Sequence, residues 1–125
     1  MIVAVPVLKT QRGYVVSPHF GKAPFVAFVE VDGGTYKIIE VAENPAGQGR
    51  AGHGGGRVLI AKILSRNPSA VIAMEMGEGA FSELSSRGVK VFYLPPEKKI
   101  IGLEEALELF LAGSLEEAKA PRELF

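Results

Sequence analysis

The stretch AVIAMEMGEGAFSELSSRGVKVFY, residues 70–93, decides the fold class of this 125-residue chain. It opens with an apolar run at 70–74, which is typical of a buried strand, and it closes with a second strand-like run at 89–93. Between them, residues 77–87 have helical spacing with Phe81 and Leu84 facing inward, and Gly88 is placed to end the helix. A strand, a helix and a strand in this order predict two parallel strands joined by a right-handed crossover.

The segment before this unit predicts antiparallel strands. Runs rich in β-branched and aromatic residues occur at 2–7, 14–16, 25–31 and 36–41. The last two runs are separated by Asp32-Gly33-Gly34-Thr35, which favours a hairpin. Pro6 is expected near the end of its strand, where a missing backbone donor is tolerated. The sequence therefore predicts an α/β protein with a mixed sheet flanked by helices, and a ligand site at the carboxyl ends of the parallel strands.

Further helices are indicated on both sides of residues 70–93. Residues 59–64 carry an apolar helical face, and Asn67-Pro68 ends that helix. Residues 102–112 have the strongest amphipathic pattern and are followed by Gly113. Ser114 and Glu117 match a capping box, which predicts a short last helix that Pro121 limits. We expect residues 1–125 to form a single domain.

The composition excludes several kinds of site. The chain has no cysteine, which rules out a zinc–thiolate site, a cysteine nucleophile and an iron–sulfur cluster held by its own thiolates. Asp32 is the one aspartate, so the clustered carboxylates of a two-metal hydrolase are missing. With 14 basic and 14 acidic residues the formal net charge is zero, which argues against a nucleic-acid binder or a membrane-surface binder. The apolar start is too short for a signal peptide, so we expect a cytoplasmic protein with no membrane partner.

The most unusual segment is the loop at 47–56, which has six glycines in ten residues. Its first part matches G-x-G-x-x-G, a motif that in dinucleotide-binding proteins follows a strand directly and begins a helix. Here three residues separate it from the preceding strand, and a second glycine cluster lies between it and the helix. No nicotinamide or flavin cofactor is therefore expected. The stretch between Glu43 and Glu75 contains basic residues (Arg50, Arg57, Lys62 and Arg66) and no carboxylate. The loop could wrap an anionic ligand, and the alternatives are a surface loop and a solvated basic helix face.

Both histidines of the chain, His19 and His53, fall in predicted loops. His19 lies in the segment Ser17-Pro18-His19-Phe20-Gly21, directly before a strand. Two imidazoles can help to hold a metal, although in a chain without thiolates the ligand must bring donors of its own. A hydrogen-bonded structural role is the alternative for each histidine.

Three motifs in order along the chain resemble the dinitrogenase iron-molybdenum cofactor biosynthesis family. They are Ser17-x-His19-Phe20-Gly21-x-Ala23-x-Phe25, then Glu43-Asn44-Pro45-Ala46 before the glycine-rich loop, then Gly77-x-x-Ala80-x-x-x-Leu84-x-x-x-Gly88-Val89-x-Val91. The resemblance covers nearly the whole chain. It implies a mixed five-stranded sheet flanked by helices, with a ribonuclease H-like motif. It also implies a small carrier of the iron-molybdenum cofactor or of its iron–sulfur precursor cluster, rather than an enzyme.

The resemblance also assigns candidate site residues. His19, in the S-x-H-F-G position, is the first candidate for a metal contact, and His53 in the glycine loop is the second. Further contacts to the cofactor are expected at the matching positions, which are Phe20, Gly21, Asn44, Arg50, Gly52, Gly54 and Gly77. Where family members often have Gly-Pro, this chain has Gly77-Glu78, which places a negative charge near the expected site.

The sequence thus predicts a non-catalytic metallocluster carrier whose partner is a protein that donates or accepts the cluster. We expect a monomer or a weak homodimer. Two interpretations from other classes remain open. One is a nucleotide- or nucleic-acid-binding domain that uses the loop at 47–56, and the other is a protein-interaction module.

Overall fold

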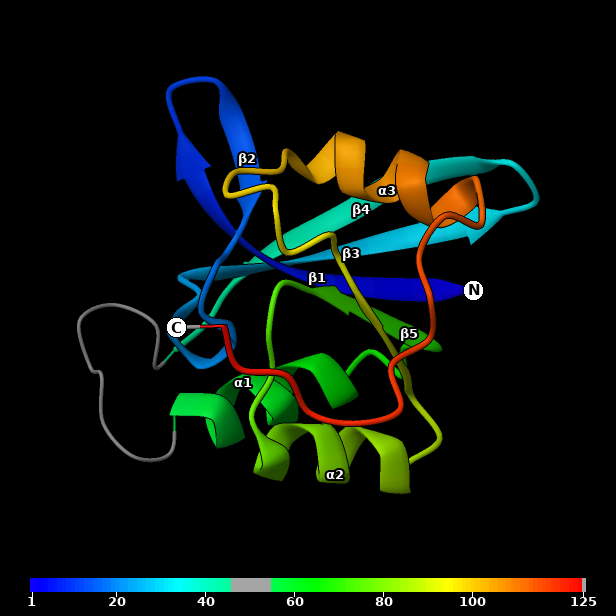
Figure 1. The fold of residues 1–125 in the computed structure, drawn as a ribbon. Coiled ribbons are helices and arrows are strands. Elements are labelled where there is room, and N and C mark those ends of the chain that lie inside the picture. Colours follow the sequence, from blue (N-terminus) through cyan, green and yellow to red (C-terminus); the bar gives the residue numbers. More distant parts are fainter. Residues whose placement is uncertain (46–54, 125) are drawn as a thin grey trace.

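The computed structural model describes residues 1–45 and 55–124, whose course is drawn in Figure 1. The strands are β1 (Ile2–Thr10), β2 (Gly13–Val16), β3 (Phe25–Asp32), β4 (Thr35–Glu43), β5 (Ala70–Ala73) and β6 (Lys90–Tyr93). The helices are α1 (Gly55–Leu64), α2 (Glu78–Ser86) and α3 (Leu103–Leu111), and a short 3-10 turn, η1 (Phe20–Lys22), precedes β3. The helix predicted at 77–87 and the helix predicted at 102–112 are each confirmed to within one residue at either end.

The strands form one mixed sheet, as the sequence predicts. Its order is β4-β3-β1-β5-β6, with β2 paired to β1 outside this path. Strands β3 and β4 are antiparallel to their neighbours, whereas β5 is parallel to both β1 and β6. The family resemblance implies five strands, and the described residues form six, because the short run at 14–16 folds back on β1 as β2. The ribonuclease H-like motif stays a prediction.

Strand β1 supports both halves of the sheet. One edge pairs with β3 over residues 2–7. The other edge pairs with β5 at Val3 and Ala4, and with β2 from Val7 to Thr10. Pro6 therefore lies inside the strand and not near its end, between the two partners on that edge. Its carbonyl accepts a hydrogen bond from the Ser17 amide (2.9 Å), and its lack of an N–H interrupts neither ladder.

Helices cover both faces of the sheet. Figure 1 shows α3 above the strands and α1 and α2 below them. The α3 face is packed with Leu103, Ala106 and Leu107 against alternate residues of β1, β3 and β5. The opposite face is packed with side chains of α1 and α2 against the intervening strand residues. All four residues of β5 are buried, as expected for a parallel strand covered on both sides.

The prediction of a short last helix that begins at Ser114 and Glu117 is wrong. Residues 114–124, which we call the C-terminal strap, run in an irregular, partly extended course from α3 to the carboxyl end of β5 (red in Figure 1). The Ala118 amide donates to the Val91 carbonyl (2.7 Å), and Glu117 forms a bridge with Phe92. The strap thus pairs with the outer edge of β6, which would otherwise present unpaired backbone groups. That pairing outweighs a capping box whose helix would end at Pro121 within two turns.

No helix in the described part of the chain is long and apolar enough to span a membrane.

The buried centre of β5 makes a direct test of this core. Ile72 is fully buried, whereas Ile100 is 77% exposed. Because truncation of a buried isoleucine leaves a cavity, Ile72→Ala should lower the free energy of unfolding by about 2–5 kcal/mol. Ile100→Ala, the matched control, should change it by less than about 0.5 kcal/mol. Urea denaturation followed by circular dichroism measures both, and equal effects would contradict the assigned core.

Candidate functional site

His19 lies on the turn between β2 and β3, directly before η1. The hydroxyl of the buried Ser17 donates to the His19 carbonyl (2.9 Å), which fixes the backbone of the histidine. At the other end of the turn, the Asn44 side chain donates to the Ala23 carbonyl (2.8 Å) and the Asn44 amide donates to the Pro24 carbonyl (2.9 Å). Two short polar side chains thus attach the turn to the sheet, as short polar residues commonly do beside prolines and glycines.

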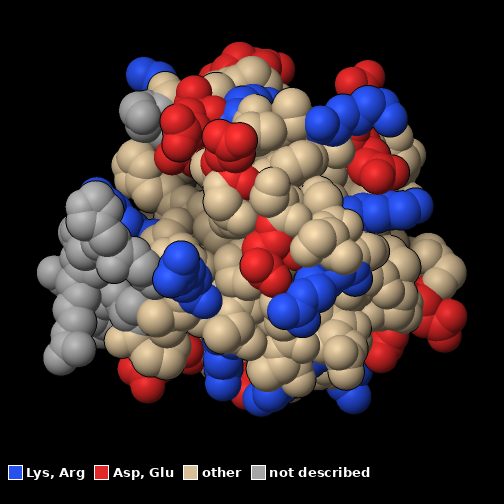
Figure 2. All heavy atoms as spheres, turned by 90° about the horizontal axis from the view of Figure 1, so that it is seen from below, with Lys and Arg blue, Asp and Glu red and all other residues tan. Residues whose placement is uncertain are grey.

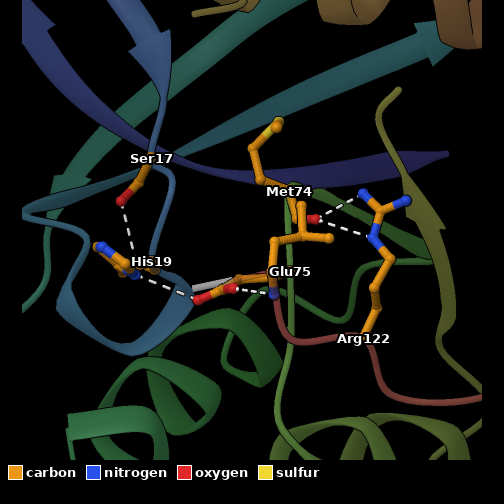
Figure 3. Close-up of polar contacts among 6 residues, drawn as sticks. Ser17, His19, Met74, Glu75 and Arg122 are labelled. Carbon is orange, nitrogen blue, oxygen red and sulfur yellow. Dashed lines mark hydrogen bonds and ion pairs between the residues drawn. The ribbon is translucent and has the colours of Figure 1, made fainter. Parts of the chain in front are cut away.

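Glu75 joins this turn to the carboxyl end of β5. Its Oε1 lies 3.2 Å from His19 Nδ1, and its Oε2 accepts a hydrogen bond from the backbone amide of Leu124 at 2.7 Å. Figure 3 shows the His19 ring and the Glu75 carboxylate pointing toward each other. The Glu75 side chain is 13% exposed and that of His19 is 47% exposed. A largely buried carboxylate therefore holds a half-exposed imidazole.

This contact favours one tautomer of the neutral ring. An ionised carboxylate can only accept hydrogen bonds, so it pairs with the tautomer that carries its proton on Nδ1. The neutral ring then carries its lone pair on Nε2, and this is the arrangement in which a carboxylate commonly orients a metal-binding histidine.

The other candidates from the sequence have different environments. Phe20 is buried, and it packs beneath the turn with Leu59 and Ile63 of α1. Gly21 follows it within η1, and Asn44 is buried where it attaches the turn. Gly77 is the N-terminal cap of α2, two residues after Glu75, and a Cβ atom built there would lie 3.2 Å from Glu123 Oε1. The structure thus brings His19, Phe20 and Gly21 together on one turn, with Asn44, directly after the end of β4, hydrogen-bonded to the last residues of that turn, and it places Gly77 just beyond Glu75.

Four candidates, Arg50, Gly52, His53 and Gly54, lie outside the described residues. Their roles as cofactor or metal contacts stay predictions.

Two residues of the site, Glu75 and Leu124, are not among the candidates that the sequence predicts. Glu75 is 56 residues from His19, and Leu124 lies beyond Pro121, where the sequence predicts no helix or strand. The one available indication was a carboxylate directly after a buried strand, at the edge where a ligand site is expected in a parallel sheet.

Arg122 fastens the C-terminal strap beside Glu75. Its guanidinium donates to the Met74 carbonyl from Nε (3.2 Å) and Nη2 (2.6 Å), and to the Leu94 carbonyl from Nη2 (2.6 Å). It also lies over the Tyr93 ring, 4.5 Å from the centroid. Burial lowers the pKa of Arg122, which nevertheless stays charged. The backbone of Arg122 pairs with that of Met76 through hydrogen bonds of 2.8 and 3.0 Å.

The described residues contain no group of three or more histidine and carboxylate side chains arranged to hold a metal ion.

The basic stretch is partly neutralised by ion pairs. Arg66 binds Glu40 at 3.0 and 3.1 Å and lowers the pKa of that carboxyl through this hydrogen bond. A groove of about 760 Å³ between α1 and α2 is lined by Arg57 and Arg87 among small and apolar side chains, and Arg87 pairs with Glu83 (3.2 Å). Figure 2 shows basic and acidic side chains interspersed over this face. The described part of the stretch thus resembles a solvated helix face more than a concentrated anion site.

Comparison with known proteins gives a consistent assignment. The family described as dinitrogenase iron-molybdenum cofactor matches residues 1–113. An uncharacterised protein of Methanocaldococcus jannaschii is 32% identical over 100 residues, which cover 80% of each chain.

Two solved structures share the fold. The apo form of the orange protein from Desulfovibrio gigas has a TM-score of 0.80 at 24% identity, covering 98% of this chain and 96% of that one. An NMR structure of a candidate NifB protein from Thermotoga has a TM-score of 0.71 at 28% identity, covering 93% and 91%.

The anchoring of the strap can be tested through Tyr93. Its hydroxyl donates to the Ala120 carbonyl (2.9 Å), and burial raises its pKa against the opposing effect of the Arg122 charge. The folded state therefore holds the phenol proton more tightly than the unfolded chain. This contribution to stability is complete below the pKa that Tyr93 has in the unfolded chain, and it is lost as pH rises through the pKa that Tyr93 has in the folded protein.

Tyr93→Phe should lower the free energy of unfolding by about 0.5–1.5 kcal/mol at neutral pH, because the hydrogen bond to the strap is lost. The difference from the wild-type protein should narrow as pH rises above about 10. Urea denaturation over a pH series measures this. A difference that stays constant through the alkaline range would contradict the assigned role of the phenol proton.

Proposed function

Because the chain belongs to the dinitrogenase iron-molybdenum cofactor family, we propose that it is a small metallocluster carrier without catalytic activity of its own. Its cargo is the iron-molybdenum cofactor or an iron–sulfur precursor cluster, held during assembly or delivery. The observation that carries this proposal is the half-exposed His19, oriented through Nδ1 by the nearly buried Glu75.

The donor set fits a preassembled cluster better than a bare ion. A free divalent metal ordinarily needs three or four protein ligands, and the described residues bring no three histidine or carboxylate side chains together to supply them. A cluster brings sulfide ligands with it, so one imidazole is enough to attach it. Attachment through one side chain is weak, which suits a protein that must pass its cargo on.

The surroundings of His19 support the same function. The His19 side chain is 47% exposed, while Glu75 holds the ring at Nδ1 and Ser17 holds the backbone carbonyl of the same residue. Lys22 ends the same turn and supplies a positive charge. A ring that is fixed before the cargo arrives loses less conformational entropy on binding.

The proposed partner is a protein that donates or accepts the cluster. The carrier acts as a monomer or a weak homodimer in this proposal.

An anaerobic titration of the purified protein with the iron-molybdenum cofactor, and separately with an iron–sulfur cluster, tests the proposal. The wild-type protein should retain one cluster through gel filtration, measured by visible absorption and metal analysis. His19→Ala should lower the affinity by more than about tenfold, since even loss of an outer-shell partner has an effect of that size. His53→Ala, the comparison with the other histidine, should have a smaller effect.

Circular dichroism and urea denaturation of both variants show whether the fold is kept. A folded wild-type protein that retains neither cluster would overturn the carrier function. Affinity unchanged in His19→Ala would remove His19 from the site. Thermal stabilisation by a nucleotide, about 2.7 kcal/mol at a hundred times its dissociation constant, would instead favour the nucleotide-binding interpretation.

A further inference from the structure

We infer that the C-terminal strap is a positioning element of the His19 site, which acts through the hydrogen bond from the Leu124 amide to Glu75. The coupling between the strap and His19 rests on the geometry alone. Its effect on cluster affinity rests on the proposed function. The family match ends at residue 113, so the strap lies outside the matched region.

Glu75 needs a second contact to orient His19. The terminal torsion of a glutamate side chain has broad energy wells, so one hydrogen bond to an exposed ring does not fix it. The Leu124 amide binds Oε2 at 2.7 Å, shorter than an ordinary amide hydrogen bond, and leaves Oε1 directed at His19 Nδ1. Strap and histidine thus lie on opposite oxygens of one carboxylate (Figure 3).

The C-terminal strap is fixed strongly enough to serve as this contact. Arg122, two residues before Leu124, makes three charge-assisted hydrogen bonds to carbonyls at the ends of neighbouring strands. Tyr93 adds a hydrogen bond to Ala120, and the backbone of Arg122 pairs with Met76 directly after Glu75. These contacts, at Ala120 and Arg122, lie within four residues of the Leu124 amide.

The hydrogen bond from Leu124 to Glu75 affects the tautomer of His19. When Glu75 is held, the neutral ring is kept in the form that is protonated at Nδ1. When the Leu124 hydrogen bond is lost, the carboxylate rotates more freely and the ring loses that preference. Because coupling between two sites is reciprocal, a ligand that binds the oriented ring also tightens the strap.

The test uses the full-length, cluster-free protein with 15N-labelled histidine, at a pH where the ring is neutral. NMR then gives the ratio of the two His19 tautomers. Leu124→Pro removes the amide proton, and Leu124→Ala keeps it while also removing the leucine side chain, so the pair isolates the hydrogen bond. The ratio of the Nδ1-protonated to the Nε2-protonated form should be roughly twofold to tenfold lower in the proline variant than in the alanine variant.

A second pair tests the anchor. Arg122→Ala should shift the tautomer ratio in the same direction, whereas Lys119→Ala, which removes an exposed basic side chain from the same strap, should not. Amide hydrogen exchange in all four variants reports whether the rest of the fold is kept.

The outcomes separate this inference from the carrier function. Equal tautomer ratios in the proline and alanine variants would overturn the inference, whether or not the wild-type protein retains a cluster. A shifted ratio in a protein that binds no cluster would support the positioning role and reject the carrier. If the tautomer ratio shifts and the wild-type protein also binds a cluster, the cluster affinity should be lower in Leu124→Pro than in Leu124→Ala, by a factor similar to that of the tautomer ratio.

Discussion

The pairing of β1 with strands on both of its edges holds the molecule together. One edge belongs to β3 along most of its length, and the other is divided between β5 and β2. Strands β5 and β2 can share one edge of β1 only because they pair with different residues of it, and Pro6 lies between the two paired segments. The core follows from this arrangement, because β1 and β5 send alternate side chains to the two helical layers.

The candidate site depends on the same arrangement. The parallel strands end at one edge of the sheet, and their last carbonyls need partners there. Arg122 supplies donors to the carbonyls of Met74 and Leu94, which brings the C-terminal strap to the residue that follows Met74. The turn that carries His19 reaches the same place because β2 leaves β1 beside β5. Glu75 thus accepts hydrogen bonds from segments at opposite ends of the chain.

The sequence predicts correctly those elements whose structure depends on residues close to one another along the chain. The strands, the hairpin at 32–35 and the helices α2 and α3 follow from local periodicity and glycine positions. The prediction failed at Ser114, where the capping-box pattern carries no information about the open edge of β6. His19 was found through a motif, but its partner Glu75 was not, since their contact is decided by tertiary packing over 56 residues.

The division of one β1 edge between two partners also sets an order of assembly. During synthesis β2 follows β1 directly and β3 follows soon after, so these antiparallel pairs can close early. The partner of Val3 and Ala4 on the divided edge is β5, which begins only at Ala70. Until then the valine-rich start of the chain has one uncovered edge, which is open to pairing with other chains. Before residue 70 is synthesised, the edge of β1 at Val3 and Ala4 therefore lacks its partner within the chain.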